Sequence, residues 1–570
     1  MRNPRVADNA VGGTAPDPLR IVFVLYSLGF LRFFDPVVRA LVERGHEVHL
    51  LCERDYERPS EQRWLAAMRA SPLFSYELTH ALAGDRWAPI GRFLRSAADL
   101  AYFSSPAFRG KRSLVQRAGR RAPTLFRRLT EGPFLRSERL RILLWRTLTG
   151  LERALPVAQP LELELRRKSP DVLVVSPFLM PGMRHSEYVR TARHLGIPSC
   201  MCIASWDNLS NKAHLRDPAD RLVVWNGVQR REAMELHGVP EERIAITGAQ
   251  SFDIWFDWTP RAREEFCPHV GLDPERGYLM YVGGSLYRGK MTEAAYVHDV
   301  WIPEIRRDPR LADLGLLLRP HPYRMTQWAE QDWSSWRDVV LWPRNQDEMP
   351  VDEEARADYF DSIFHSEAVV GINTSAMIES AIVGRAVHTI LAPEFEGSQT
   401  GTFHFDYLRE VGGGVLATAH TYAEHRDQLL ATLAGNDAEA ETRRRRFLEE
   451  FVRPLGLERP AVPAVIETIE TIARHGPIAT EPQGLGLFPM RALLYGALGL
   501  TTVLGPVVTP FANAKRRRRL LERLRRLPRG AFRRGRRLAY SGRSSRHSSI
   551  RRAHRLARLA VRIGNRGWQR

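Results

Sequence analysis

The sequence predicts an α/β protein with two Rossmann-like parallel-sheet domains that face a cleft, and three observations support this fold class. Continuous apolar segments alternate with segments of helical periodicity, which is typical of a parallel sheet covered by helices on both faces. The alternation occurs twice, in one series that begins at residue 19 and in another that begins near residue 277. A chain of 570 residues is also long enough for two or three domains with sizeable cores.

The first series opens with LRIVFVLYSLGFLRFFDPVVRALVERGHEVHLLCER. Its pattern predicts a strand over residues 21–26, a helix over about residues 33–44 and a second strand over residues 47–52. Because parallel sheets bind ligands at the carboxyl ends of their strands, we expect the loop that contains Gly29 to face a crevice. The series resumes at DVLVVSPF, and the predicted N-terminal Rossmann-like domain covers residues 19–258.

A segment of different composition interrupts this first series. Residues 86–153 carry 16 Lys/Arg against four Asp/Glu, with leucines and aromatic residues at helical spacing. The pattern predicts a helical insertion, basic on one face, over about residues 85–165.

The second series contains GYLMYVGGSLYRG, LGLLLRPHPYRM, VVLWPRNQ, AVVGINTSAMIESAIVGRAVHTI and GGVLATAH. It predicts a C-terminal domain over residues 275–475, with a linker near residues 255–274. Two such domains in one chain make a cleft between them the natural expectation.

The charge of the chain is concentrated at its C-terminal end. Residues 515–570 carry 22 Lys/Arg and one acid, whereas the rest of the chain holds 62 basic and 64 acidic residues. The body is therefore nearly neutral, and the formal charge of +19 comes from an Arg-rich tail, so nucleic acid is not the expected partner of the body. At the other end, residues 1–18 are rich in Gly, Pro, Ala and Asp and predict a disordered leader.

An apolar segment precedes the basic tail. Residues 492–514 contain no charged side chain, and an apolar segment over 488–514 beside a polybasic tail predicts binding to an anionic membrane surface through residues 488–570. The length suffices to span a bilayer, but Pro506 and Pro510 favour a re-entrant or interfacial segment. The alternatives for the tail are a solvated segment and nonspecific binding of RNA or DNA.

The compartment is predicted from cysteine usage and from the N-terminal pattern. The four cysteines form no disulfide framework, and no early apolar stretch has the layout of a signal peptide. We therefore expect a cytoplasmic protein that is peripheral on the inner face of the cytoplasmic membrane.

The stretch VVGINTSAMIESAIVGRAVHTI predicts an anion site at a helix start. Helix amino termini present unpaired NH groups and a positive dipole end, so they hold phosphate, and Asn373, Thr374 and Ser375 would add side-chain donors there. Glu379 follows one turn later on the face of Ser375, where its carboxylate could accept hydrogen bonds from a ribose. The alternative is an N-cap followed by a solvated acid.

Two further strand ends supply candidates for donor binding. In YVGGSLYRG, Gly283, Gly284 and Ser285 would let the backbone approach a ligand closely, although an ordinary strand-end turn has the same pattern. In LLLRPHPY, Arg319 and His321 follow a buried strand, and both would stabilise a diphosphate as negative charge develops on it. A capped strand end with an exposed histidine is the alternative for the second motif.

The acceptor side is predicted from SWDNLSNK, which follows a strand over residues 199–204. Asp207 is the candidate general base and Lys212 could offset negative charge, with Asn208 beside them, although an Asx turn explains the same residues. His185 is an alternative base. The sequence has no HExxH motif and no paired CxxC motifs, so no metal is expected.

Taken together, these motifs resemble the GT-B superfamily of nucleotide-sugar enzymes, and within it the proteins related to UDP-GlcNAc 2-epimerase and CDP-glycerol glycerophosphotransferase. The similarity lies in GVPEERIAITGAQSFD, YVGGS, RPHP and NTSAMIESAIVGRAV, and in SWDNLSNK and VVWNGVQRREAMELHG, and it covers about residues 19–60 and 168–475. The insertion and the tail depart from the family pattern. The helix also reads TSAMIE where the epimerases carry an SGG turn, which favours a transferase.

The resemblance implies a division of labour between the domains. It implies a nucleotide-sugar donor in the C-terminal domain, with the glycine turn and the Ser375 helix on the diphosphate and Glu379 on the ribose. It also implies an acceptor against the N-terminal domain, and transfer without a bound metal.

The leading hypothesis is a metal-independent GT-B glycosyltransferase of cell-envelope polysaccharide biosynthesis. It would move a sugar from a nucleotide-diphosphate donor to a hydroxyl of a lipid-linked or cell-surface glycan acceptor, with no cofactor besides the nucleotide-sugar substrate. A CDP-polyol phosphotransferase and a UDP-GlcNAc 2-epimerase-like enzyme are the enzymatic alternatives. The non-enzymatic alternative is a scaffold that binds membranes or nucleic acid.

Overall fold

The computed structural model describes most of the chain except its two ends and several short internal segments. The described residues are 17–54, 58–79, 85–108, 111–122, 126–128, 137–176, 184–285, 291–344, 350–435, 438–478 and 489–496. The predicted leader up to residue 16, the apolar segment from residue 497 onward and the Arg-rich tail lie outside these residues, so the predictions for them are untested. Both sheets lie in one compact unit that ends at Leu494.

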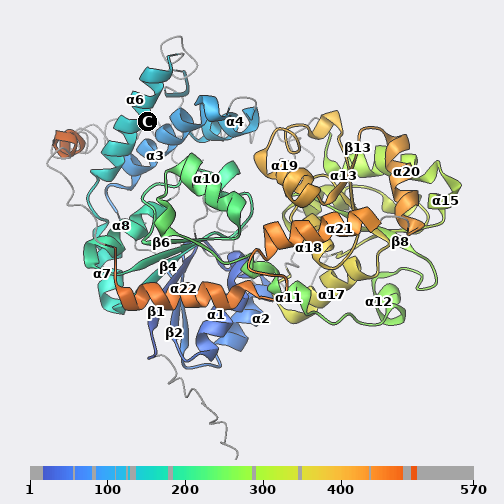
Figure 1. Ribbon diagram of the computed structural model, residues 1–570, viewed down its shortest axis with the longest axis horizontal. Helices are drawn as coiled ribbons and strands as arrows, with labels where there is room; N and C mark the ends of the chain where they lie inside the picture. The colour runs from blue at the N-terminus through green and yellow to red at the C-terminus, as the bar shows by residue number, and fades with distance from the viewer. Residues whose placement is uncertain are drawn as a thin grey trace, which may run out of the picture. The chain divides into compact units, whose positions relative to one another are not determined.

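The first sheet is fully parallel and has the strand order β3-β2-β1-β4-β5-β6-β7 (Figure 1). Strand β1 lies at its centre, with Ile21 opposite Val48 of β2 on one side and Val172 of β4 on the other. The strands are β1 (Arg20–Leu25), β2 (Glu47–Cys52), β3 (Phe74–Leu78), β4 (Val172–Val175), β5 (Ser199–Cys202), β6 (Arg221–Val224) and β7 (Ile244–Ile246).

The second sheet is also parallel, with the order β10-β9-β8-β11-β12-β13. Its strands are β8 (Tyr278–Val282), β9 (Gly315–Arg319), β10 (Val339–Leu341), β11 (Ala368–Gly371), β12 (Val387–Ile390) and β13 (Leu416–Ala419). The two sheets confirm the predicted fold class. The edge strands β3 and β7 lie outside the predicted strands, because both are short and most of their side chains are only half-buried.

Helices cover both faces of each sheet. In the first half of the chain they are α1 (Leu31–Glu43), α2 (Pro59–Met68), α3 (Ala88–Phe103), α4 (Arg112–Arg121), α6 (Glu138–Arg153), α7 (Gln159–Lys168), α8 (His185–Leu195), α9 (Asn208–Asn211), α10 (Gly227–His237), α11 (Asp253–Phe256) and α12 (Arg263–Val270). In the second half they are α13 (Glu293–Tyr296), α14 (Ile302–Arg306), α15 (Pro309–Ala312), α16 (Met325–Ala329), α17 (Glu353–Phe364), α18 (Ala376–Ile382), α19 (Phe403–Glu410), α20 (Tyr422–Leu433), α21 (Ala438–Phe447) and α22 (Ala461–His475).

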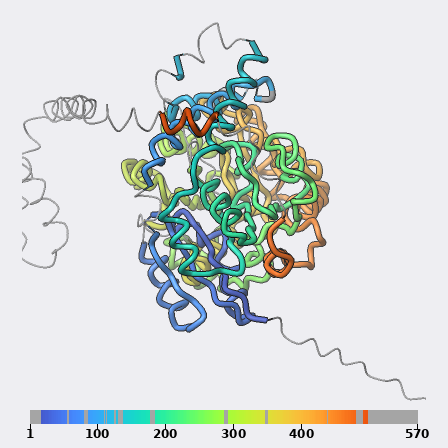
Figure 2. The backbone as a smooth tube through the Cα atoms, turned by 90° about the vertical axis from the view of Figure 1, so that its left-hand side faces the viewer, coloured from blue at the N-terminus to red at the C-terminus, as the bar shows by residue number. Residues whose placement is uncertain are grey.

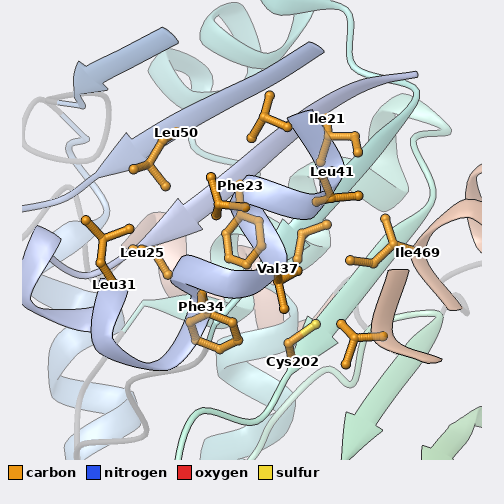
Figure 3. Close-up of a cluster of buried hydrophobic side chains, with 14 of the residues drawn as sticks. Ile21, Phe23, Leu25, Leu31, Phe34, Val37, Leu41, Leu50, Cys202 and Ile469 are labelled. Carbon is orange, nitrogen blue, oxygen red and sulfur yellow. The ribbon is translucent and has the colours of Figure 1, made fainter. Parts of the chain in front are cut away.

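Alternate side chains of one strand enter different cores, which is why most strand residues are apolar. Phe23 of β1 packs with α1 and Leu50 of β2 on one face of the first sheet (Figure 3). Val22 and Val24 pack on the other face, against α7 and α8. Because successive side chains of a strand point to opposite faces, a sheet covered on both sides requires apolar residues at every strand position.

The last helix returns to the first sheet. The sequence assigns residues 461–475 to the C-terminal domain, whereas α22 packs in the core of the N-terminal domain, with Ile469 beside Ile21 and Leu41 (Figures 1 and 3). The Asp253 carboxylate anchors the start of α22, since it accepts from the Val462 amide at 2.8 Å. The helix was misassigned because its apolar stripe predicts burial but not the sheet against which it is buried.

The insertion is helical, as predicted, and consists of α3, α4 and α6, with α7 after them in the chain (Figure 1). Not all of its basic residues are on the surface, because Arg95 of α3 is buried and pairs with Glu187 at 2.7 Å. No helix within the described residues is both long enough and apolar enough to cross a membrane.

Replacing Ile469 with alanine tests the packing of α22. The Ile469→Ala variant should lose about 2–5 kcal/mol of unfolding free energy, because it leaves a cavity between α22 and the first sheet. Urea denaturation would measure the loss, with Glu467→Ala, an exposed site on the same helix, as the control. Equal stability of the two variants would contradict the packing described for α22.

Candidate functional site

Two adjoining cavities open between the two sheets, and residues from both domains line each of them. The aromatic cavity encloses about 930 Å³ of empty space and is lined by residues that include Trp206, Trp225, Phe252, Trp255 and Tyr359. The polar cavity encloses about 1030 Å³ and is lined mainly by polar and charged side chains. The residues that line both are Arg32, Phe33, Ser205, Trp206, His321, Thr374 and Ser375.

Strand ends from both domains supply the lining of these cavities. Ala204 and Ser205 follow β5, Gly283 follows β8, and Pro320 and His321 follow β9. This arrangement agrees with the general rule that open α/β sheets bind ligands at the carboxyl ends of their strands.

The start of α18 lies at the junction of the cavities. Thr374 and Ser375 line both of them, and Glu379 lines the aromatic cavity, so the structure brings together Ser375, Glu379 and His321 as the sequence predicts. The Tyr359 hydroxyl donates to the Glu379 carboxylate. Burial raises the pKa of Glu379, while the hydrogen bond from Tyr359 and the charge of Arg32 oppose that rise.

Asn373 differs from its predicted use as a free donor. It lines the polar cavity, but its amide nitrogen donates to the Ser398 carbonyl and to Nε2 of His404, 3.1 Å away. The Asn373 side chain therefore connects the end of β11 by hydrogen bonds to the start of α19 and to the segment before it.

The glycine turn is also engaged by the protein itself. The Gly284 amide donates to the Glu293 carboxylate at 2.8 Å, and the Gly283 amide donates to the Arg319 carbonyl at 2.9 Å. A Cβ at Gly283 would lie 3.1 Å from the His321 nitrogen, so glycine permits the close approach of the β9 loop. These two amides are not free to bind a phosphate, and Ser285 is the turn residue that lines the polar cavity.

Arg319 lines the aromatic cavity, but its guanidinium is hydrogen-bonded to other residues of the protein. Its Nη1 donates to Ser362 Oγ at 2.6 Å and to the Asp358 carbonyl at 3.0 Å, and its guanidinium lies over the Tyr359 ring. Arg319 thus supports Tyr359, which in turn holds Glu379.

His321 lines both cavities and is held in its neutral form. Burial, followed by the charges of Arg32, Arg324 and Arg58, lowers the pKa of His321 to about 3. Its Nδ1 accepts from the Tyr323 amide at 3.2 Å, so the proton of the neutral ring sits on Nε2. Neutral His321 can donate a hydrogen bond to an anionic oxygen.

Arg32, at the start of α1, is a site residue that the sequence analysis missed. It lines both cavities, and its buried Nε has no hydrogen-bond partner among the described residues. Its position just after the predicted ligand-facing loop was the signal that could have found it. Gly29 itself lines neither cavity, because it packs against Glu61 of α2, whose Oε1 would lie 3.2 Å from a Cβ at Gly29.

The predicted acceptor residues line the polar cavity as a group. Lys212 Nζ lies 2.8 Å from Asp207 Oδ2. Burial alone would raise the pKa of Asp207, but the charges of Lys212 and His404 and the hydrogen bonds to the carboxylate outweigh it and hold the pKa well below its usual range. The Asn208 side chain accepts from the amides of Ala204 and Ser205, so it shapes the turn.

His185 does not reach the cavities. It is buried at the start of α8, where burial and the charges of Arg216 and Arg95 lower its pKa to about 3. Its prediction as an alternative base is therefore wrong, because the side chain is buried and lines neither cavity.

The insertion contributes to the polar cavity and touches the second domain. Arg117 of α4 lines the polar cavity and donates to the Asn211 carbonyl. Lys111 binds the carbonyls of Thr400 and Thr402 and pairs with Asp406 at 3.0 Å. The contacts of Lys111 join residues nearly 300 positions apart, which no local sequence pattern indicates.

The fold and the cavities define a two-domain protein of GT-B architecture, in which two Rossmann-like sheets place their strand ends at a shared cleft. No family model matches the sequence, and no curated protein matches it.

Several solved structures are similar to this chain at low identity. A glycosyltransferase from Rickettsia africae ESF-5 is 9% identical, with a TM-score of 0.45 over 80% of this chain and 99% of that chain. UDP-GlcNAc 2-epimerase from Neisseria meningitidis bound to UDP-GlcNAc is 11% identical, with a TM-score of 0.46 over 79% and 99%. The wall teichoic acid polymerase TagF is 11% identical, with a TM-score of 0.43 over 80% and 90%.

Removing the charge of Arg32 should raise the pKa of His321. In Arg32→Gln the pKa should rise from about 3 toward the ordinary value of 6.5, because one of the positive charges that disfavour protonation is lost. In the native protein, the stability contributed by neutral His321 is lost as pH falls from about 6.5 to about 3. In the variant, the folded-state pKa is closer to 6.5, so this pH-dependent loss of unfolding free energy should occur over a narrower pH range.

Nuclear magnetic resonance of labelled histidine would measure this pKa. Arg69→Gln, at an exposed arginine at the end of α2, is the control and should leave it unchanged. The same pKa in both variants would contradict the placement of Arg32 beside His321.

Proposed function

We propose that the chain is a glycosyltransferase that moves a sugar from a nucleotide-diphosphate donor to a hydroxyl of a lipid-linked or cell-surface glycan acceptor. The observation that carries the proposal is the pair of joined cavities, one aromatic with a buried carboxylate and one polar with several cations. A nucleoside needs an apolar surface for its base and an acceptor for its ribose hydroxyls. A sugar and its acceptor need many polar contacts.

The aromatic cavity suits the nucleoside of the donor. Trp255 and Phe252 offer flat apolar surface for a base, and Glu379 can accept hydrogen bonds from both hydroxyls of a ribose. Tyr359 holds the carboxylate in position, so little side-chain ordering is required when the ligand binds.

The diphosphate would lie where the cavities meet. Arg32, neutral His321 and the start of α18 line that junction, and each offers hydrogen-bond donors or positive potential. These groups are fixed before the ligand arrives, so they would stabilise the charge that develops on the leaving diphosphate. Arg32, rather than Arg319, would therefore stabilise the diphosphate.

The polar cavity suits the transferred sugar and the acceptor hydroxyl. Asp207, paired with Lys212, is a weak base, so hydrogen-bond acceptance and positioning of the acceptor are the roles that its low pKa favours. Metal-independent transfer and a location on the inner face of the cytoplasmic membrane, held by residues 488–570, are further parts of the proposal.

A CDP-polyol phosphotransferase is the second candidate. The polar cavity is lined by Arg32, Arg117 and Lys212, and three cations would suit an acceptor or donor group that carries its own phosphate. The identity of the nucleotide that binds separates the two candidates, since a CDP-linked donor defines the second.

A nucleotide panel tests the proposed donor site. UDP, GDP, CDP and dTDP compounds are compared by thermal shift, and a matching ligand at 100 times its Kd should stabilise the protein by about 2.7 kcal/mol. Glu379→Gln should raise the Kd of the nucleotide about tenfold and so reduce the thermal shift. The amide offers one hydrogen-bond acceptor fewer to the ribose, while it still accepts from Tyr359.

The control for this panel is Glu330→Gln, an exposed acid in the same domain. Failure of every nucleotide to protect the protein, together with steep salt-dependent RNA binding, would support the scaffold alternative instead.

A second substitution separates the acceptor side from the donor side. Asp207→Asn should keep nucleotide protection but lower transfer by about 10²-fold or more, because the acceptor hydroxyl loses its positioning carboxylate. The Asp207→Asn/Lys212→Met double variant leaves no unpaired buried charge, so it controls for instability. If Asp207→Asn lost nucleotide protection but kept transfer, the assignment of the donor to the aromatic cavity and of the acceptor to the polar cavity would be wrong.

A further inference from the structure

The outer face of α6 exposes large apolar side chains to solvent. Leu143 is 60% exposed, and Leu140 and Ile142 are each 38% exposed. The opposite face of the helix, with Leu148 and Glu152, is buried against the rest of the first domain. A surface helix normally turns its apolar stripe inward, so three exposed aliphatic residues within one turn indicate a surface that binds something.

Exposed arginines lie on the same face of α6 as these apolar residues. Arg139, Leu143 and Arg146 are spaced so that they share one helix face, and both arginines are exposed. Glu138 is the only acid in the described residues of α6 outside the buried Glu152. Apolar residues flanked by arginines on one face are typical of helices that lie in the headgroup region of an anionic bilayer.

A segment near the C-terminal end of the described residues lies beside α6. Residues 489–494 form a short helical segment beside α6 (red, Figures 1 and 2), and Met490 approaches Gly150 so closely that a Cβ there would lie 3.0 Å from its Sδ. Leu493 is 69% exposed. In the sequence, the uncharged residues 492–514 overlap the end of this segment and are followed by the 22 Lys/Arg of residues 515–570.

We propose that Arg139, Leu140, Ile142, Leu143 and Arg146 form a docking face for an anionic lipid bilayer. The face lies on the folded body, so it is distinct from attachment through residues 488–570. Its apolar side chains would enter the interfacial layer while its arginines bind lipid headgroups. Two attachment points would fix the orientation of the enzyme on the membrane, which a single attachment point cannot do.

A fluorescent label at position 143 of the full-length chain tests this face directly. All four native cysteines are buried, so Leu143→Cys can be labelled selectively with an environment-sensitive dye. Vesicles with about one-third phosphatidylglycerol should shift its emission to the blue and raise its intensity about twofold or more, whereas pure phosphatidylcholine vesicles should not. Leu163→Cys on α7, 62% exposed, is the matched control and should not respond.

Each other outcome overturns the proposal. An unchanged signal at position 143 would show that the face stays in water. A response that depends on protein concentration without vesicles would identify a second copy as the occupant. A blue-shifted signal before vesicles are added would identify the chain's own C-terminal segment, and equal responses at positions 143 and 163 would indicate nonspecific adsorption.

A binding measurement complements the label. The Leu140→Gln/Ile142→Gln/Leu143→Gln variant of the full-length chain should bind the anionic vesicles about tenfold more weakly in co-sedimentation, since the buried apolar area is lost. Leu163→Gln should bind as the native chain does. Unweakened binding by the triple variant would mean that residues 488–570 alone hold the membrane, and the proposal would be wrong.

Discussion

Burial of both faces of two parallel sheets is the constraint on which the rest of this structure depends. Phe23 and Val22 are neighbours in β1 but enter different cores, so most strand positions carry apolar side chains. Most of the polar side chains that line the cavities lie in segments that follow the strands. Because all strands of a parallel sheet end on the same side, those segments converge, and in this chain they converge on the two cavities.

The electrostatics of the cleft follow from the same burial. Low solvent access disfavours charge, so it raises the pKa of Glu379 and lowers that of His321 to about 3. Asp207 departs from this trend because Lys212 lies 2.8 Å away and stabilises the ionised carboxylate. The result is a cleft with fixed cations, a neutral histidine and a positioned carboxylate, which is the arrangement that supports the proposed nucleotide-diphosphate donor.

The insertion connects several properties of the molecule that are separate in the sequence. It buries Arg95 against the first domain, delivers Arg117 to the polar cavity and contacts the second domain through Lys111. It also carries the exposed face of α6. One segment thus connects the proposed membrane contact with the wall of the polar cavity.

The sequence by itself determined the two sheets, most of their strands, and the convergence of Ser375, Glu379 and His321, because strand periodicity and the rule for parallel strand ends are local properties of the chain. Only the tertiary structure decided which predicted ligand-binding groups already have hydrogen-bond partners within the protein. The Gly284 amide donates to Glu293, and the Arg319 guanidinium donates to Ser362. The tertiary structure also decided that Arg32 enters the site and that α22 returns to the first sheet. These contacts join residues far apart in the chain, and a sequence pattern shows that a side chain is buried or polar but not which distant partner it meets.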